Sequence, residues 1–204
     1  MKAILLALAF ILALPAAAQS SPEASGATDP ALRSELLSMY EADQAIRQRL
    51  IEAGIAEPDS ALLAEMVATD AAHLARVVEI VDVHGWPGAA LVGMDGSNAA
   101  FMILQHGDTA TQERLLPLVE AAYRSGDLHG QSYALLLDRV LVGKGEPQVY
   151  GTQAGFGAEG EILVSPLADP ETVDARRAEV GLPPLAEYLA MLESFYFPEA
   201  TGTE

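Results

Sequence analysis

Two histidines stand at the ends of a largely apolar stretch, "HGWPGAALVGMDGSNAAFMILQHGD", where His84 precedes Gly85 and His106 precedes Gly107. Imidazole is the side chain whose ordinary pKa, about 6.5, suits proton transfer near neutral pH. We therefore expect His84 and His106 as candidate catalytic acids or bases. Glycine commonly ends a helix, so the same positions also suit histidines that only finish helix ends.

A metal site built on these histidines has little support in the spacing. His84 and His106 are 106 − 84 = 22 positions apart, which matches no compact ligand motif, and the pattern HExxH is absent. We predict no metal ligands and no cofactor. A metal-dependent hydrolase stays an alternative, because two histidines at two helix ends could meet beside a carboxylate.

A carboxylate interrupts the apolar stripe of the first expected helix. Asp43 falls inside that stripe, and Arg47 lies four residues further on, within reach on the same helix face. A buried carboxylate needs a partner. Asp43 and Arg47 therefore form either an ion pair that organises the core or part of a cleft, and with Gln44 they are candidate ligand-binding residues.

A second polar group follows near the middle of the chain. Asp138 and Arg139 end an apolar helix in "YALLLDRVLV", and "QVYGTQ" then supplies Gln148, Tyr150 and Gln153. We expect this run to be a short strand that lines a pocket or presents a wet outer face. Asp138 is a candidate catalytic residue, and Arg139, Gln148, Tyr150 and Gln153 are candidate ligand-binding residues.

Composition excludes several classes of function. The chain carries 29 acidic and 11 basic residues, a net charge of −18, so we expect no nucleic-acid partner, since binding phosphate backbones needs clustered Lys and Arg. It has no cysteine for a thiol nucleophile or a disulfide. The motifs of serine hydrolases, Walker-type nucleotide binding and dinucleotide binding are also absent.

The first residues predict export. Residues 1–18, "MKAILLALAFILALPAAA", combine a lysine, a short apolar run and a small-residue end, as a cleavable signal peptide does. We expect cleavage after Ala18, no stable membrane anchor afterwards, and a periplasmic or extracellular protein. Residues 19–30 read as a flexible linker, residues 31–197 as a single helical domain, and residues 198–204 as a disordered tail.

Apolar periodicity and helix-ending residues predict a mainly α fold. We expect a compact bundle of about six to seven helices, with one small β-hairpin between the fifth helix and the C-terminal helices. The expected helices span about 30–54, 60–84, 96–106, 110–125, 131–140, 170–180 and 185–195. The hairpin is expected from "QVYGTQ" and "EILVSP".

Several stretches, taken in order, resemble a bacterial family known as domain of unknown function 6624 (DUF6624) over roughly residues 36–188. They are "MYEADQAIR", "HGWPG", "VG", "ILQHGD", "LDRVLVGKGEPQVYGTQ" and "PLADPETVDARRAEVGLPPLAEY". The resemblance implies that the polar residues above share one pattern with Trp86 and Gln105. Packing alone seldom requires so many specific polar residues, so the shared pattern favours a pocket lined by these residues over a purely structural role.

Two hypotheses follow. In the first, the protein is an exported enzyme or a small-molecule-binding domain, whose cleft gathers His84, His106, Asp138 and their polar neighbours, with Arg47 or Arg139 holding an anionic group. In the second, it is a non-catalytic interaction module, in which the same residues cap helices and tie the hairpin to the bundle. The partner is then an unknown small molecule or protein.

Overall fold

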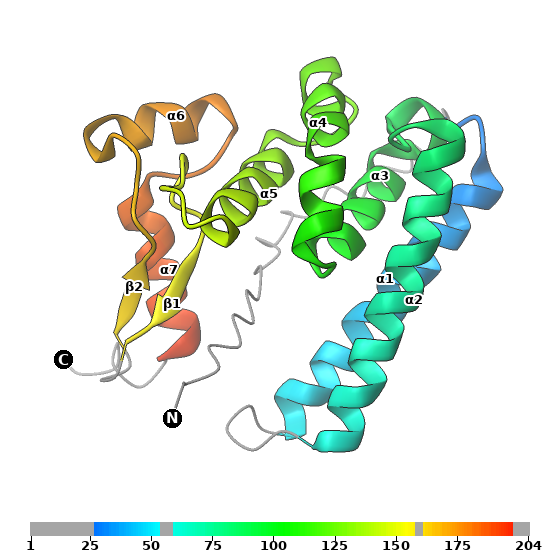
Figure 1. Cartoon of the computed structure of the whole chain (residues 1–204), viewed down its shortest axis with the longest axis horizontal. Coiled ribbons are helices and arrows are strands. Elements are labelled where there is room, and N and C mark those ends of the chain that lie inside the picture. The colour runs from blue at the N-terminus through cyan, green and yellow to red at the C-terminus, as the bar shows by residue number, and fades with distance from the viewer. Residues whose placement is uncertain (1–26, 54–58, 158–160, 198–204) are drawn as a thin grey trace. The chain divides into compact units, whose positions relative to one another are not determined.

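The computed structural model describes residues 27–53, 59–157 and 161–197. Within them lie seven α-helices and one two-stranded antiparallel sheet, so the predicted mainly α fold with a small hairpin after the fifth helix is confirmed (Figure 1). The predicted signal peptide, most of the linker and the tail lie outside the described residues. None of the described helices is long and apolar enough to cross a membrane.

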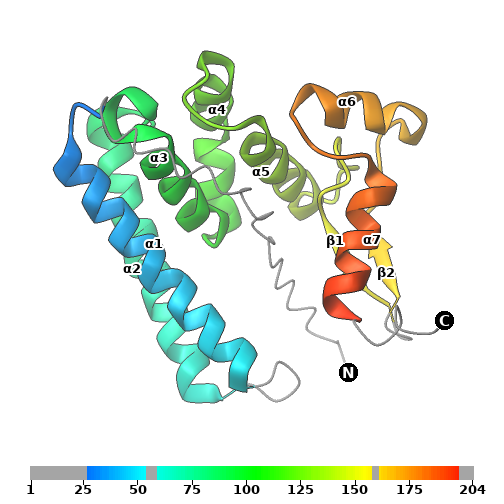
Figure 2. The same ribbon diagram turned by 180° about the vertical axis from the view of Figure 1, so that it is seen from behind.

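The described residues form two compact units, residues 27–133 and residues 134–197. The first unit is built on an antiparallel pair of long helices, α1 (Pro30–Ala53) and α2 (Ser60–His84). Helix α3 (Ala89–Gln105) packs against both, and α4 (Thr109–Ser125) follows (Figure 2). Helix α5 (Gly130–Gly143) begins in this unit and continues into the second.

Local sequence explains where these helices begin and end. The carboxylate of Asp59 accepts the N–H of Ala61 at the start of α2, and Asp108 accepts that of Thr111 at the start of α4. Such caps satisfy amide groups that have no partner inside the helix. Apolar side chains at helical spacing then fill the interface, with Ile46, Leu50 and Leu62 forming a core cluster between α1 and α2.

Helix α3 begins earlier than the sequence suggests. We predicted a start near residue 96, but the helix begins at Ala89 and contains one non-helical residue, Gly93, with φ 75° and ψ 162°. Left-handed φ values are open to glycine at little cost, so the chain changes direction there without ending the helix. Beyond this break, Ala99 to Gln105 are all buried. The C-terminal half of this apolar helix is therefore enclosed by the rest of the protein.

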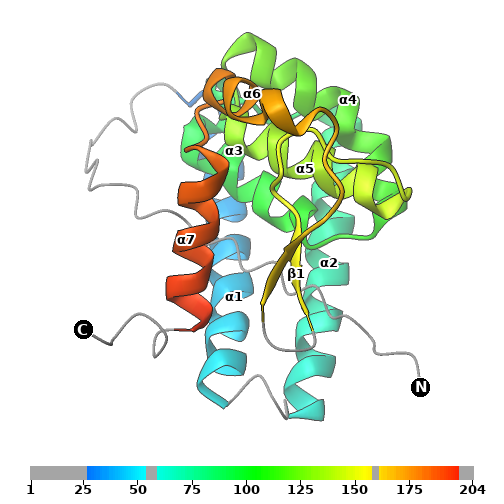
Figure 3. The same cartoon turned by 90° about the vertical axis from the view of Figure 1, so that its left-hand side faces the viewer.

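The second unit holds the end of α5, strands β1 (Ala154–Phe156) and β2 (Ile162–Val164), and helices α6 (Val173–Glu179) and α7 (Leu185–Tyr196). A single 3-10 turn, Pro170–Thr172, precedes α6. Gly155 pairs with Leu163 at the centre of the hairpin. Helix α7 contacts β2 and α6 (Figure 3).

The strand predicted over residues 148–153 is wrong, because β1 begins at Ala154. The backbone of this segment is used differently. Val149, Tyr150 and Thr152 donate their N–H groups to the carboxylate of Asp138, and Gly151 has a left-handed φ of 72°. Donors that converge on one side chain cannot also form a strand ladder.

Candidate functional site

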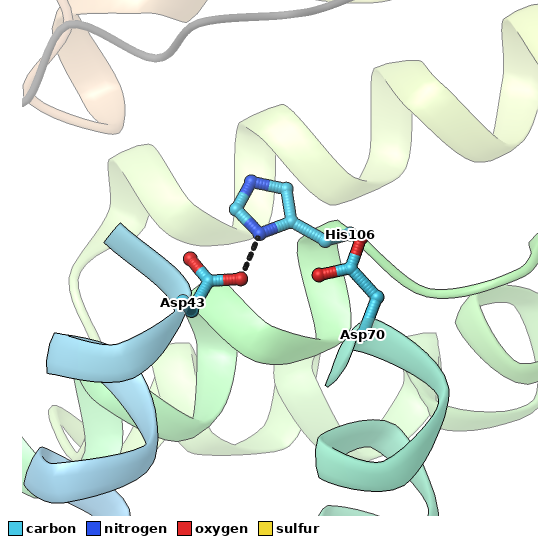
Figure 4. Close-up of side chains that lie close together, drawn as sticks. All are labelled: Asp43, Asp70 and His106. Atoms are coloured by element: carbon cyan, nitrogen blue, oxygen red, sulfur yellow. Dashed lines mark hydrogen bonds and ion pairs between the residues drawn. The ribbon is translucent and has the colours of Figure 1, made fainter. Parts of the chain in front are cut away.

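A partly buried polar cluster lies in the first unit, where α1, α2 and the end of α3 meet (Figure 4). It contains Asp43 from α1, Asp70 from α2 and His106, which directly follows α3. Asp43 is 2% exposed. Its position on the apolar stripe of α1 places a carboxylate inside the core, as the stripe predicted.

The C-terminus of α3 holds His106 in place. Gln112, buried on α4, donates its side-chain N–H groups to the carbonyl oxygens of Leu104, Gln105 and Gly107, at 3.2, 3.0 and 3.1 Å. Helix α3 ends at Gln105, so carbonyls at its C-terminus lack the partners that a further turn would supply; that of Leu104 also accepts the N–H of Gly107. The side chain of Gln112 therefore fixes the backbone on both sides of His106 by hydrogen bonds.

Asp43 orients the imidazole of His106. The Nδ1 atom of His106 lies 3.0 Å from Oδ1 of Asp43. An ionised carboxylate can only accept a hydrogen bond, so Nδ1 carries the hydrogen and, in the neutral ring, Nε2 has a free lone pair. Nε2 lies on the side of the ring that faces away from Asp43 (Figure 4). The side chain of His106 is 14% exposed.

Arg47 links the two carboxylates. Its Nη1 lies 3.0 Å from Asp43 Oδ1, and its Nη2 lies 3.1 Å from Asp70 Oδ1. The Asp43–Arg47 ion pair, one of the two alternatives that the sequence left open, is therefore present. Gln44 donates to the other oxygen of Asp43 at 2.7 Å. The guanidinium of Arg47 is thus committed to protein carboxylates, and charge neutralisation is its role within this cluster.

The two carboxylates have pKa values shifted in opposite directions. Burial raises the pKa of Asp43, but the hydrogen bond and charge of His106, with Arg47 and Gln44, outweigh burial and hold it below its ordinary value. Burial raises the pKa of Asp70 above its ordinary value, and Arg47 offsets only part of that rise. Neighbouring acids separated in this way are suited to different protonation states.

The same three side chains could hold a cation. One ligand atom each from Asp43, Asp70 and His106 lie within 4.8 Å of one another. Carboxylate and imidazole ligands suit Zn²⁺ and Mn²⁺. A cation at this position would compete with Arg47, whose positive charge already contacts both carboxylates.

The second candidate histidine lies elsewhere in the first unit. His84 is exposed at the last residue of α2, fourteen residues after Asp70 on the same helix. At 1.5 Å per residue the two are about 21 Å apart along the helix. The structure therefore does not bring His84 to His106. The neighbouring Trp86 donates its indole N–H to Ser97 at 2.9 Å, as a packing residue does.

Asp138 is the centre of a separate arrangement in the second unit. It is fully buried, and its oxygens accept the N–H groups of Val149, Tyr150 and Thr152 and the hydroxyl of Thr152, at 2.7 to 3.2 Å. Both oxygens are engaged with protein donors. This arrangement gives Asp138 a structural role in fixing residues 149–152.

Gln148 and Gln153 complete the same turn. The Gln148 amide donates to the carbonyl oxygens of Gln153 and Ser165 and accepts the N–H of Gln153. Gln153 also donates to the hydroxyl of Thr152 at 3.1 Å. The structure thus gathers Asp138, Gln148, Tyr150 and Gln153 around one buried loop, with Arg139 beside Asp138 on α5.

Sequence reasoning missed Asp70, although the signal was present. Asp70 lies four residues after Met66 and four before Leu74, so it interrupts the inward stripe of α2 just as Asp43 interrupts that of α1. Helix α2 continues through Asp70 without a break. Arg177, also missed, is fully buried. No apolar stripe marks its position within the seven residues of α6.

No curated protein and no solved structure matches the chain. The sequence does match a family described as a family of unknown function, DUF6624, over residues 30–199. That range includes the Asp43, Asp70 and His106 cluster and the turn around Asp138. Because the match covers well over half of the chain, the protein belongs to the DUF6624 family.

Proposed function

We propose that the protein is an exported enzyme that acts on a small polar molecule by general acid–base catalysis, with His106 as the base. The observation that carries this proposal is the 3.0 Å contact between His106 Nδ1 and the buried carboxylate of Asp43. A carboxylate in this position fixes the tautomer and orientation of the ring and leaves Nε2 to accept a proton. Asp43 is then a positioning residue.

Asp70 supplies the complementary group in this proposal. Its raised pKa extends the pH range over which the carboxyl keeps a proton, while Asp43 stays ionised beside His106. Moving a proton on and off a substrate needs one group that accepts a proton and a nearby group that supplies one. Arg47 keeps the two carboxylates together without neutralising either by proton transfer, since arginine stays charged.

The test is a screen of purified mature protein against chromogenic esters, phosphate esters and glycosides, with three variants measured beside the wild type. We expect His106→Gln to lower kcat by about 10²- to 10⁴-fold, the usual contribution of a general base. Asp43→Asn should lower kcat as well and leave KM nearly unchanged. The exposed His129 provides the control, since His129→Gln should keep the wild-type rate.

The result also decides between catalysis and an interaction module. A catalytic His106 predicts that His106→Gln loses turnover while its melting temperature changes little. If the variant instead melts at a markedly lower temperature and no substrate is turned over by the wild type, His106 only ties the helices together and the proposal fails.

A metal-dependent hydrolase is the second candidate, favoured by the ligand atoms of Asp43, Asp70 and His106 within 4.8 Å of one another. Calorimetric titration of the protein with Zn²⁺ and with Mn²⁺ tests it. Stoichiometric binding that is lost in Asp70→Asn would support the metal site. Failure of both ions to bind would discard it.

The export part of the proposal rests on residues 1–18. Expression of the full chain in a bacterial host, followed by mass spectrometry of the periplasmic and medium fractions, tests it directly. We expect a mature chain that begins at Gln19. Recovery of uncleaved protein in the cytoplasm alone would contradict export.

A further inference from the structure

Arg139 carries an unpaired edge of its guanidinium group. Its Nε and Nη2 atoms are buried and have no hydrogen-bond partner among the described residues. Nε and Nη2 form the side of the guanidinium that presents two parallel N–H donors, the geometry that binds two oxygens of one carboxylate or phosphate. Burial lowers the pKa of Arg139, and Tyr188 offsets part of that shift. Arginine stays charged in proteins, so the buried donors belong to a cation.

Arg177, in the same unit, has a related feature. It is fully buried, donates to the carbonyl oxygens of Pro183 and Tyr150 at 2.6 and 2.7 Å, and leaves Nη2 unpaired among the described residues. Its guanidinium stacks on the ring of Tyr188, 5.0 Å from the ring centroid. Burial raises the pKa of the Tyr188 hydroxyl above its ordinary value, and the positive charges of Arg177 and Arg139 offset part of that rise.

Arg139 has no acidic partner among the described residues, although the chain is rich in acidic residues. The protein has 29 acidic residues, and six other arginines of the described part pair with them: Arg33, Arg47, Arg49, Arg76, Arg114 and Arg124. The nearest acid along the chain, Asp138, directs its oxygens to the backbone of residues 149–152. An unpaired buried cation is costly, because the group loses its hydration without gaining a partner.

We propose that Arg139 binds the oxyanion of a ligand, a carboxylate or phosphate group held by the Nε–Nη2 edge of Arg139. The site is independent of His106 and goes beyond the proposed acid–base function. Because the donor atoms are buried, it fits a small anionic group better than an extended charged surface.

Thermal unfolding in inorganic phosphate, acetate and chloride at equal ionic strength tests the site. A ligand that binds only the folded state raises the ratio of folded to unfolded protein by 1 + [L]/Kd, about 11-fold at ten times its Kd. We expect phosphate or acetate to give a saturable rise in Tm over chloride in the wild type. Phosphate alone would assign the site to a phosphate group, and acetate alone to a carboxylate.

Three variants make the test specific. Arg139→Met should remove the anion-dependent rise, and because it removes an unpaired buried charge it should be at least as stable as the wild type in chloride. Arg139→Lys keeps the charge without the paired donors, so it should weaken binding at least tenfold. Lys144→Gln removes an exposed positive charge from the same unit and should keep the full rise.

Three results would overturn the proposal. The first is a wild-type protein whose Tm is the same in all three anions. The second is an Arg139→Met variant that keeps the anion-dependent rise. The third is an Arg139→Met variant that fails to fold or melts far below the wild type in chloride, because Arg139 would then be paired within the folded protein.

Discussion

Replacing Asp138 with asparagine tests whether this residue is a structural centre. In the wild type, Asp138 Oδ1 accepts the N–H groups of Val149 and Tyr150, and Oδ2 accepts the N–H and hydroxyl of Thr152. Asparagine keeps one accepting oxygen and turns the other into an N–H donor. The N–H of Thr152 then faces another donor, while the hydroxyl can rotate to accept.

The expected loss follows from those contacts. A buried donor left without a partner costs about 1 to 3 kcal/mol. The hydrogen bonds from the N–H groups of Val149 and Tyr150 then go to a neutral amide oxygen instead of a charged carboxylate, which lowers the stabilisation from each by about 1 kcal/mol. The free energy of unfolding should therefore fall by about 4 kcal/mol in Asp138→Asn. With a urea m-value near 2 kcal/mol per molar, the transition midpoint falls by about 2 M.

The assay is urea unfolding followed by far-UV circular dichroism, with hydrogen exchange of the peptide that covers residues 148–153 as a local readout. About 4 kcal/mol corresponds to roughly a thousandfold faster exchange at the most protected amides. The exposed Glu146→Gln, which makes the same chemical change in the same unit, should lie within about 0.5 kcal/mol of the wild type. A loss in Asp138→Asn below about 1 kcal/mol would refute the reasoning.

Three further predictions concern the first unit. The folded-state pKa of Asp43 is lowered, so the ionised carboxylate stabilises the folded protein above the ordinary pKa of 3.8, and this stabilisation is lost as pH falls through the folded-state pKa. Asp43→Asn should therefore be less stable than the wild type at pH 7. A stability difference equally large at pH 2 would contradict this. Gln105 is fully buried with both amide atoms unpaired among the described residues, so Gln105→Leu should raise the free energy of unfolding by about 1 kcal/mol in urea titration, and a marked loss would mean that the amide has a partner. Gly93→Ala places a Cβ 2.8 Å from Asp95 Oδ1 and forces a non-glycine residue to adopt a φ of 75°. The Tm of this variant should therefore fall by several degrees. An unchanged Tm would show that the backbone at the break in α3 accepts a side chain without strain.

Much of the fold followed from local sequence signals. Helix α1 begins at the predicted Pro30 and ends beside the predicted Gly54, because proline fits the first turn of a helix and an apolar stripe runs between the two residues. The segment 148–153 could not be assigned in the same way. The backbone N–H groups of its β-forming residues donate to Asp138 across 11 to 14 positions, a contact that periodicity does not record.

The candidate site was predictable in part for the same reason. Asp43 was identified because a carboxylate on an apolar stripe needs a partner, and Arg47 is that partner at helical spacing. The contact from Asp43 to His106 spans 63 positions and depends on how α1 packs against α3. The sequence pattern associated His106 with His84 instead, because a glycine follows each of them, and this similarity reflects how helices end.

The most direct test of the acid–base proposal is the tautomer of His106 in the folded protein. Long-range ¹H–¹⁵N correlation spectra, recorded at a pH where the imidazole is neutral, distinguish a protonated Nδ1 from a protonated Nε2, and the exposed His129 serves as an internal reference. The proposal predicts that the hydrogen of His106 resides on Nδ1 and that Nε2 is unprotonated. A hydrogen on Nε2 would show that Asp43 does not hold the ring as a base and would contradict the proposed role.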